Sequence, residues 1–327
     1  MLKNYNKIFT ILILVISFGV CDVYTLYSQP IIPEFANKNK DTTKKQLFDF
    51  RLSADISNAS MRYDKDGNNI LRDTAYYFID SLEETQDYYE YLTDFSQQKY
   101  NLHIGYLGVK NLYCYAKLPL AFTSVLERVT VENQRYDRNK DSKPYFEGVQ
   151  FDAGYSFNLD FVNLDFLNVT FGGSVFFPFH AYSASELIDE FHSKKIEYGR
   201  TLETSFVMKM DWVLKTTRLQ IGVIEQFRKD FADRTQLNFL IGTSNIENTE
   251  LYANLKYVKS NGDYQEKYRV DFWRPTLWEN YLDMDLGFTI FFTDEIYSNV
   301  GYTIRLWGEN TFSRNLVNIN LGYIFSK

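Results

Sequence analysis

The feature that most constrains the fold is a two-residue alternation of apolar and polar side chains that recurs in short segments along the chain. In the last such segment, residues 315–325, the even positions carry Asn318, Asn320 and Gly322. The odd positions carry Val317, Ile319, Leu321, Tyr323 and Phe325. A period of two places alternate side chains on opposite faces of a β-strand. This segment is therefore predicted to be a strand with one apolar face.

The same alternation returns often enough to predict an all-β chain of about twelve strands. The strands are expected near 47–58, 98–108, 112–122, 146–158, 166–178, 199–212, 216–228, 234–243, 249–259, 280–292, 296–307 and 315–325. Residues 264–273 alternate as well, and counting them raises the alternative number to fourteen. After residue 28 the chain has no apolar window of about 18 residues, so no helical membrane span is predicted.

Residues 315–325 resemble the closing strand of bacterial outer-membrane β-barrel proteins, a strand of about ten residues with an aromatic side chain near the chain end. The chain departs from that pattern because Ser326 and Lys327 follow Phe325. The general resemblance to porin-like and transporter-like barrels covers nearly all of residues 47–327 and names no specific member. It implies a transmembrane antiparallel up-and-down barrel in the outer membrane of a Gram-negative bacterium. It further implies that the odd positions from Val317 to Phe325 belong to the address that the barrel-assembly machinery reads.

The composition agrees with a barrel whose strands are one-sided. Aromatic residues make up 18% of the chain, with 26 Tyr and 28 Phe, while the mean hydropathy is −0.33. Alternating lipid-facing and lumen-facing residues give a polar average, and aromatic girdles form at the two membrane interfaces. The net charge of −7 argues against a nucleic-acid partner. The expected partners are membrane lipid, the assembly machinery and small solutes.

The N-terminus is predicted to be a cleaved export signal spanning residues 1–28. Lys3 and Lys7 precede an apolar run from residue 8 to 20, which is shorter than the roughly 20 residues of a membrane-spanning helix. An uncleaved anchor and lipoprotein processing at Cys21 are the alternatives. Residues 29–46 are expected to form a flexible periplasmic tail, and Cys114 then remains as the single cysteine of the mature chain.

Connections of unequal length predict which end of the barrel faces outward. Long connections are expected at 59–97, 123–145, 179–198 and 260–279, and short ones at most of the intervening turns. Outer-membrane barrels have short periplasmic turns and longer extracellular loops. The first long connection is acidic and rich in tyrosine, and residues 64–68 faintly resemble a calcium-binding loop. The alternative to a binding role is that this connection is a solvated acidic surface loop. Residues 183–195 are predicted to include a short helix.

Charged side chains on the polar faces predict a polar interior, since a charge on the lipid face costs about 2–4 kcal/mol near the membrane midplane. The candidate lumen-lining residues are Asp49, Arg51, Asp55, Lys117, Asp152, Glu203, Lys209, Asp211, Lys256, Asp283, Asp285 and Arg305. Opposite charges can either line a conducting lumen or bridge and block it. The favoured function is a narrow, cation-favouring pathway for small solutes, with the acidic first connection at its mouth.

Two other functional classes stay open at this point. One is a non-conducting scaffold or adhesin, or the membrane partner of a secreted protein. The other is a barrel lipase, which needs a serine within reach of a histidine. The three histidines, His103, His180 and His192, lie in no lipase-like motif. Neither a catalytic residue nor a metal ligand or cofactor is predicted. Residues 112–123 faintly resemble barrels that take up hydrophobic compounds, and a soluble β-sandwich is the remaining structural alternative.

Overall fold

The structure of the protein is a computed structural model. It describes residues 47–64, 66–70, 73–77, 87–107, 112–131, 134–141, 144–159, 164–179, 201–214, 216–229, 231–246, 248–263 and 278–326. The predicted signal peptide (1–28), the tail (29–46), the short helix at 183–195, the additional strand at 264–273, His180 and His192 lie outside the described residues. Among the residues that are described, no helix has the length and apolar character needed to cross a membrane.

Twelve antiparallel strands close into one barrel, which confirms the predicted fold and strand number. They are β1 (Leu47–Tyr63), β4 (Asp87–Leu107), β5 (Leu112–Val131), β8 (Gly148–Leu159), β9 (Leu164–Pro178), β10 (Glu203–Leu214), β11 (Thr217–Arg228), β12 (Arg234–Ile246), β13 (Thr249–Ser260), β14 (Asn280–Phe291), β15 (Ile296–Glu309) and β16 (Thr311–Ser326). Each pairs with its neighbours in chain order, and β1 pairs with both β4 and β16. Closure leaves the barrel wall without an unpaired edge.

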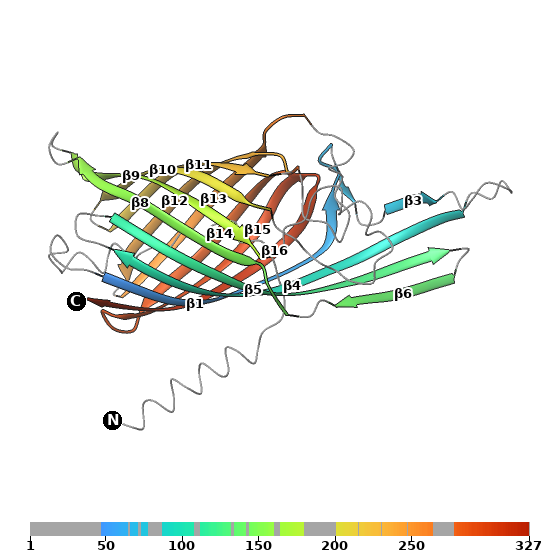
Figure 1. Cartoon of the computed structure of the whole chain (residues 1–327), viewed down its shortest axis with the longest axis horizontal. Coiled ribbons are helices and arrows are strands. Elements are labelled where there is room, and N and C mark those ends of the chain that lie inside the picture. Colours follow the sequence, from blue (N-terminus) through green and yellow to red (C-terminus); the bar gives the residue numbers. More distant parts are fainter. Residues whose placement is uncertain are drawn as a thin grey trace, which may run out of the picture.

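The two ends of the barrel differ in the length of the connections between strands (Figure 1). The end that carries the C-terminus also carries the tight connections, such as those between β10 and β11 and between β12 and β13. The long connections lie at the opposite end. Because short turns face the periplasm in this architecture, we call the first the periplasmic end and the second the outer end.

Four short strands join the sheet near the outer end: β2 (Asn69–Ile70), β3 (Asp73–Tyr77), β6 (Gln134–Asp141) and β7 (Tyr145–Phe146). Together with the long hairpin of β4 and β5, strands β3 and β6 form a sheet that extends beyond the barrel (Figure 1). The prediction that 59–97 and 123–145 are loops was therefore wrong in large part. In residues 88–92 (YYEYL) the odd positions carry two tyrosines and the even positions Tyr, Glu and Leu, so tyrosine stands on both faces and period two does not reveal the strand. In the structure this segment pairs with β5.

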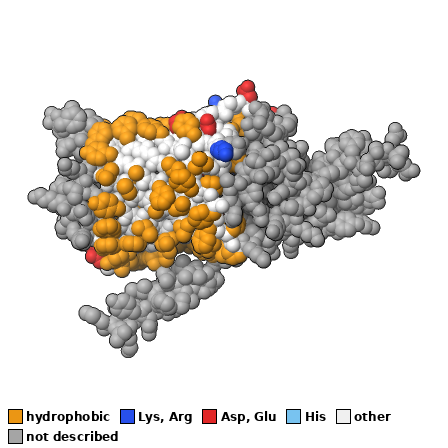
Figure 2. Space-filling view, viewed as in Figure 1, with side chains coloured by type: hydrophobic (Ala, Val, Ile, Leu, Met, Phe, Trp, Pro, Cys, Tyr) orange, Lys and Arg blue, Asp and Glu red, His pale blue; other side chains and the backbone are white. Residues whose placement is uncertain are grey.

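The outer face of the barrel is apolar. Exposed side chains such as Leu52, Phe206, Phe239 and Leu255 alternate along their strands with buried polar ones. Figure 2 shows one face of the barrel covered by hydrophobic side chains, with the few visible charges near its two ends. A closed barrel with an apolar exterior satisfies its backbone hydrogen bonds internally and matches the hydrocarbon layer. The protein is thus a β-barrel of the bacterial outer membrane.

The terminal strand confirms the faces predicted from its alternation. Asn318 and Asn320 are buried inside the barrel, while Tyr323 is exposed on the outer face. β16 pairs with β1 from Leu47↔Ser326 to Tyr63↔Thr311, with one register shift between Asn58 and Met61. The same alternation holds along most of the other barrel strands. It breaks at irregularities such as the register shift between β14 and β15, where Leu306 and Trp307 are both exposed.

Candidate functional site: the interior of the barrel

All twelve candidate lumen residues lie on the side of their strands opposite to the exposed apolar side chains. Eight of them are buried: Asp49, Arg51, Asp55, Glu203, Asp211, Lys256, Asp283 and Arg305. The other four, Lys117, Asp152, Lys209 and Asp285, are half-buried. The interior therefore contains packed polar regions together with positions that keep contact with solvent.

At the periplasmic end, a compact group joins β1 to β15. Nη2 of Arg51 lies 2.6 Å from Oδ2 of Asp49, and Nε of Arg51 donates to the hydroxyl of Tyr297 at 2.9 Å. Tyr297 donates in turn to Oδ1 of Asp49 at 3.2 Å. An added Cβ at Gly322 would collide with the Tyr297 ring. Glycine at 322 thus provides the space in which the ring lies flat against β16.

Next to this group, β1 and β4 share a polar network. The amide of Asn101 donates to Oδ2 of Asp55 at 2.8 Å and to the hydroxyl of Ser53 at 2.9 Å. Oγ of Ser53 lies 3.2 Å from Nε2 of His103. A serine beside a histidine is one element of a nucleophilic site. Here both side chains are buried to more than nine tenths, and the hydroxyl of Ser53 also accepts from Asn101.

Two further ion pairs join different strands of the wall. Nη2 of Arg218 lies 2.9 Å from Oδ1 of Asp211, to which Gln220 also donates at 2.7 Å. On the opposite part of the wall, Nζ of Lys99 lies 2.8 Å from Oε1 of Glu147. Asp211 was predicted from its alternation. Arg218, Lys99 and Glu147 were not singled out, although each stands at an inward position of a predicted strand.

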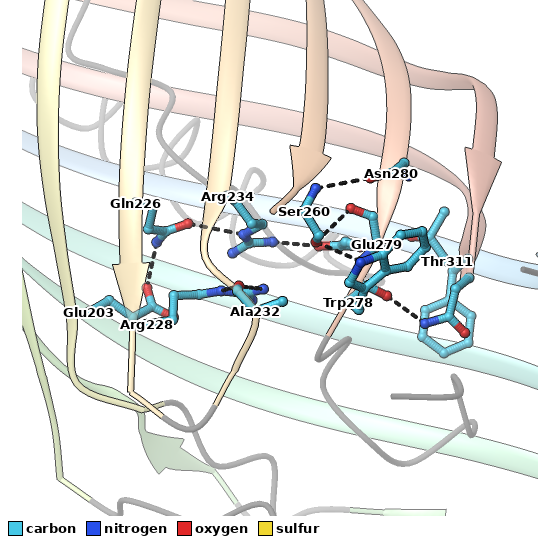
Figure 3. Close-up of polar contacts among 12 residues, drawn as sticks. Glu203, Gln226, Arg228, Ala232, Arg234, Ser260, Trp278, Glu279, Asn280 and Thr311 are labelled. Atoms are coloured by element: carbon cyan, nitrogen blue, oxygen red, sulfur yellow. Dashed lines mark hydrogen bonds and ion pairs between the residues drawn. The ribbon is translucent and has the colours of Figure 1, made fainter. Parts of the chain in front are cut away.

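Near the outer end, a chain of hydrogen bonds and ion pairs links strands β10 to β16; we call it the outer ionic network (Figure 3). Gln226 donates to Oε2 of Glu203 at 2.8 Å and accepts from Nε of Arg234 at 3.1 Å. Arg234 pairs with Oε1 of Glu279 at 2.5 Å, and the hydroxyl of Thr311 donates to Oε2 of Glu279 at 2.9 Å. Five strands thus contribute to, or border, one continuous polar layer.

The network continues around Asp283, whose side chain is completely buried. Arg305 contacts both carboxylate oxygens and also donates to Thr311. Nζ of Lys256 lies 3.4 Å from Oδ2 of Asp283, and Nη2 of Arg314 lies 3.6 Å from the same oxygen. The ring of Tyr281 lies 3.7 Å from the Arg305 guanidinium carbon. The Asp283 carboxylate therefore lies near three cations, and the face of the Tyr281 ring lies near two of them, Arg305 and Lys256.

Sequence reasoning did not single out Arg234, Glu279 or Arg314, and the last two were missed for a simple reason. Glu279 and Arg314 lie in segments that were expected to be connections, 260–279 and 308–314. In the structure Glu279 directly precedes β14, and Arg314 is the fourth residue of β16. Both side chains are buried. Strand ends are where period two is least informative, because the alternation stops within a residue or two of such positions.

Midway along the barrel, four charged side chains keep partial exposure; we call Lys117, Asp152, Lys209 and Asp285 the mid-barrel ring. Both oxygens of Asp152 accept from the amide of Gln150, at 2.8 and 2.9 Å. Oδ2 of Asp285 accepts from the amide of Asn254 at 2.8 Å. A side chain that points into a closed barrel and remains accessible must face space inside it. The ring therefore borders a space that water can enter.

The described residues show no arrangement suited to a metal ion, since no three His, Cys, Asp or Glu side chains among them are grouped. In residues 64–68, which faintly resemble a calcium-binding loop, the first carboxylate belongs to Asp64 and accepts backbone hydrogen bonds. Oδ1 of Asp64 accepts from the backbone amides of Asp66 and Asn68, at 2.9 and 2.8 Å. This carboxylate stabilises a turn beside the barrel mouth.

Comparison with solved structures places the fold among outer-membrane barrels. An outer-membrane channel of Pseudomonas putida F1 is similar over 86% of this chain and 95% of its own, with 12% identity and a TM-score of 0.50. The toluene transporter TodX of Pseudomonas putida aligns with 86% of this chain and 89% of its own, at 9% identity and a TM-score of 0.41. The porin NanC aligns with 68% of this chain and 98% of its own, at 12% identity and a TM-score of 0.38. No protein-family model and no curated protein matches the chain.

Proposed function

We propose that the barrel provides a narrow pathway for small solutes across the outer membrane. The observation that carries this proposal is the partial exposure of the mid-barrel ring within a closed barrel. Side chains that fill a lumen completely would be buried, as those of the outer ionic network are. The similar fold of an outer-membrane channel agrees with this role.

A solute that enters from the outer end would meet the outer ionic network before it reaches the mid-barrel ring. Its members retain less than a tenth of their exposure, and they join strands on one side of the barrel into a packed polar layer. On this proposal, passage requires side chains such as Arg234 and Glu279 to separate for a moment. Such a layer admits small hydrated solutes and excludes large ones, because each separation costs an ion pair its partner.

We further propose a preference for cations. It would come from the acidic residues at the outer mouth of the barrel and not from the charges of the interior. The twelve candidate residues comprise seven acids and five bases. The buried Glu147, Glu250 and Glu279, together with Lys99, Arg218, Arg228, Arg234 and Arg314, bring the described interior to ten of each. An interior of balanced charge selects weakly by sign. The acidic first connection would then attract cations before entry.

Conductance of the folded protein in a planar lipid bilayer tests the pathway. Discrete current steps are expected, with a reversal potential under a salt gradient that indicates a small cation preference. The double variant Asp64→Asn/Asp66→Asn, which neutralises two acids at the mouth, should reduce that preference. The exposed periplasmic acid Asp294 offers the matched control Asp294→Asn. Absence of current from a folded barrel, together with absence of solute flux, would refute the pathway.

A second candidate function has its own structural support. The sheet formed by β3, β4, β5 and β6 extends beyond the barrel at the outer end (Figure 1). The outer strands of an extended sheet can pair with a strand of another protein. A surface scaffold or adhesin would use this sheet, and co-purification of a stable partner that is lost when residues 132–141 are deleted would favour this function over transport. A lipase activity would require a serine that reacts with a fluorophosphonate probe.

Export and assembly complete the proposal. Cleavage after Ser28 would release the mature chain into the periplasm, and N-terminal sequencing of the purified protein tests it. The terminal strand, with Val317, Ile319, Leu321, Tyr323 and Phe325 on its outer face, would then be the segment that the assembly machinery recognises. The parity of these residues supports that role, since they form one continuous apolar face of the terminal strand.

A further inference from the structure

The accessible charges of the mid-barrel ring fall into two groups of opposite sign. Lys117 on β5 and Lys209 on β10 both interact electrostatically with Asp152, which lies between them on β8. This lysine wall presents two positive charges and one negative charge to the lumen. On the other wall, Asp285 on β14 is the half-buried charge, held by Asn254. The neighbouring Lys256 is buried against Asp283, so the accessible charge of this wall is negative.

The two walls face each other across the barrel. From β8, which carries Asp152, six steps in either direction around the closed sheet lead to β14, which carries Asp285. The charges also lie at similar distances along their strands from the periplasmic turns. Lys117 is the sixth residue of β5, Lys209 the sixth from the end of β10, and Asp285 the seventh from the end of β14, all counted from the periplasmic turns. Opposite charges therefore flank the accessible space at similar distances from the periplasmic end.

We propose that this ring selects zwitterionic solutes, of which free amino acids are the simplest, over neutral solutes of equal size. The inference rests on the proposed pathway and names its substrate class. A zwitterion can place its carboxylate beside Lys117 and Lys209 and its ammonium beside Asp285. A simple anion or cation gains at one wall and is repelled at the other, and a neutral solute gains at neither. Contacts of this kind in a hydrated lumen correspond to a preference of about three- to tenfold.

Flux of two isomeric solutes into vesicles that contain the folded protein tests the proposal. Alanine is zwitterionic and lactamide is neutral, and both have the same atomic composition, so size and mass do not distinguish them. We expect alanine to enter about three- to tenfold faster than lactamide through the wild-type protein. If lactamide enters as fast as alanine, the proposed selectivity is wrong while the pathway stands. If neither solute enters, the pathway itself fails, and the selectivity with it.

Substitutions in the two walls assign the preference to the ring. Lys117→Gln/Lys209→Gln and Asp285→Asn should each lower the ratio of alanine to lactamide flux toward one and leave lactamide flux in place. Asp285→Glu keeps the charge and should keep the ratio. Lys259→Gln and Asp263→Asn change exposed charges outside the lumen and serve as matched controls. A ratio that survives both wall variants in folded barrels would overturn the proposal.

Discussion

Asp283 and Arg305 form a two-point ion pair between neighbouring strands β14 and β15. Nε of Arg305 lies 2.7 Å from Oδ1 of Asp283, and Nη2 lies 3.1 Å from Oδ2. The Asp283 side chain has no exposed surface, and Lys256 and Arg314 approach the same carboxylate. The Asp283 carboxylate thus compensates the charge of three buried cations, Lys256, Arg305 and Arg314. Its contribution to stability therefore extends beyond the contact with Arg305.

Removing that anion should destabilise the barrel strongly. Asp283→Asn keeps the size of the side chain but leaves Arg305 and Lys256 buried without their shared carboxylate, at an expected cost of about 3–5 kcal/mol. Urea unfolding in lipid vesicles measures the change. Asp285→Asn is the matched control, because Asp285 is half-buried and accepts one charge-assisted hydrogen bond, from Asn254, worth about 1.5–3 kcal/mol. Equal losses for the two variants would contradict the central role of Asp283.

The pair of Arg234 and Glu279 is expected to restrict the pathway. Arg234→Gln and Glu279→Gln, alone and combined, form a cycle in which the coupling should be about 0.5–3 kcal/mol, since the two side chains contact each other directly. The double variant has no change in net charge. Its single-channel current should nevertheless exceed that of the wild type, because the layer can part more easily. A coupled pair whose removal leaves the current unchanged would place the restriction elsewhere.

Acid should weaken the outer ionic network through Glu279, which directly precedes β14. Burial alone would raise the pKa of this carboxyl, but the charges of Arg234, Arg305 and Arg228 outweigh it and hold the pKa below its ordinary value. A lowered pKa means that the stabilisation is complete above the unfolded-state pKa of about 4.3 and is lost as the pH falls through the folded-state pKa. The urea midpoint should therefore drop at acid pH by less in Glu279→Gln than in the wild type. Identical pH profiles would exclude this contribution.

Gly322 should be needed for stability because a side chain at this position would collide with the Tyr297 ring. In Gly322→Ala the new methyl group would occupy the place of the Tyr297 ring, and moving that ring breaks its hydrogen bonds with Arg51 and Asp49. The expected loss is about 1–3 kcal/mol by urea unfolding. Gly222→Ala is the control on β11, because its methyl group would lie 3.6 Å from Cγ of Lys209, an ordinary contact. Comparable losses at both glycines would show that the ring is not the cause.

The parity of inward and outward side chains could be predicted from the sequence because a pleated strand alternates by geometry. That rule identified Asp283 and Arg305 as inward residues, and it identified Tyr323 as an outward one. It could not show that Asp283 pairs with Arg305, since pairing depends on the register of β14 against β15, which shifts between Leu282 and Asp283. Arg314 and Glu279 were missed at strand ends, and the extension of β4 was missed because tyrosines occupy both of its faces.

Phe325 offers a way to separate assembly from stability. Its ring stacks on Phe48 and Phe50 of β1, at centroid distances of 4.9 and 5.8 Å, so any substitution also removes aromatic contacts worth about 0.5–1.5 kcal/mol. Phe50→Ala removes part of the same contact from the partner strand and leaves the terminal strand intact. If the terminal strand is the assembly address, Phe325→Ala should lower the amount of barrel in the outer membrane several-fold more than Phe50→Ala does. Both variants should refold alike from urea into lipid vesicles, and equal losses in cells would assign Phe325 to packing alone.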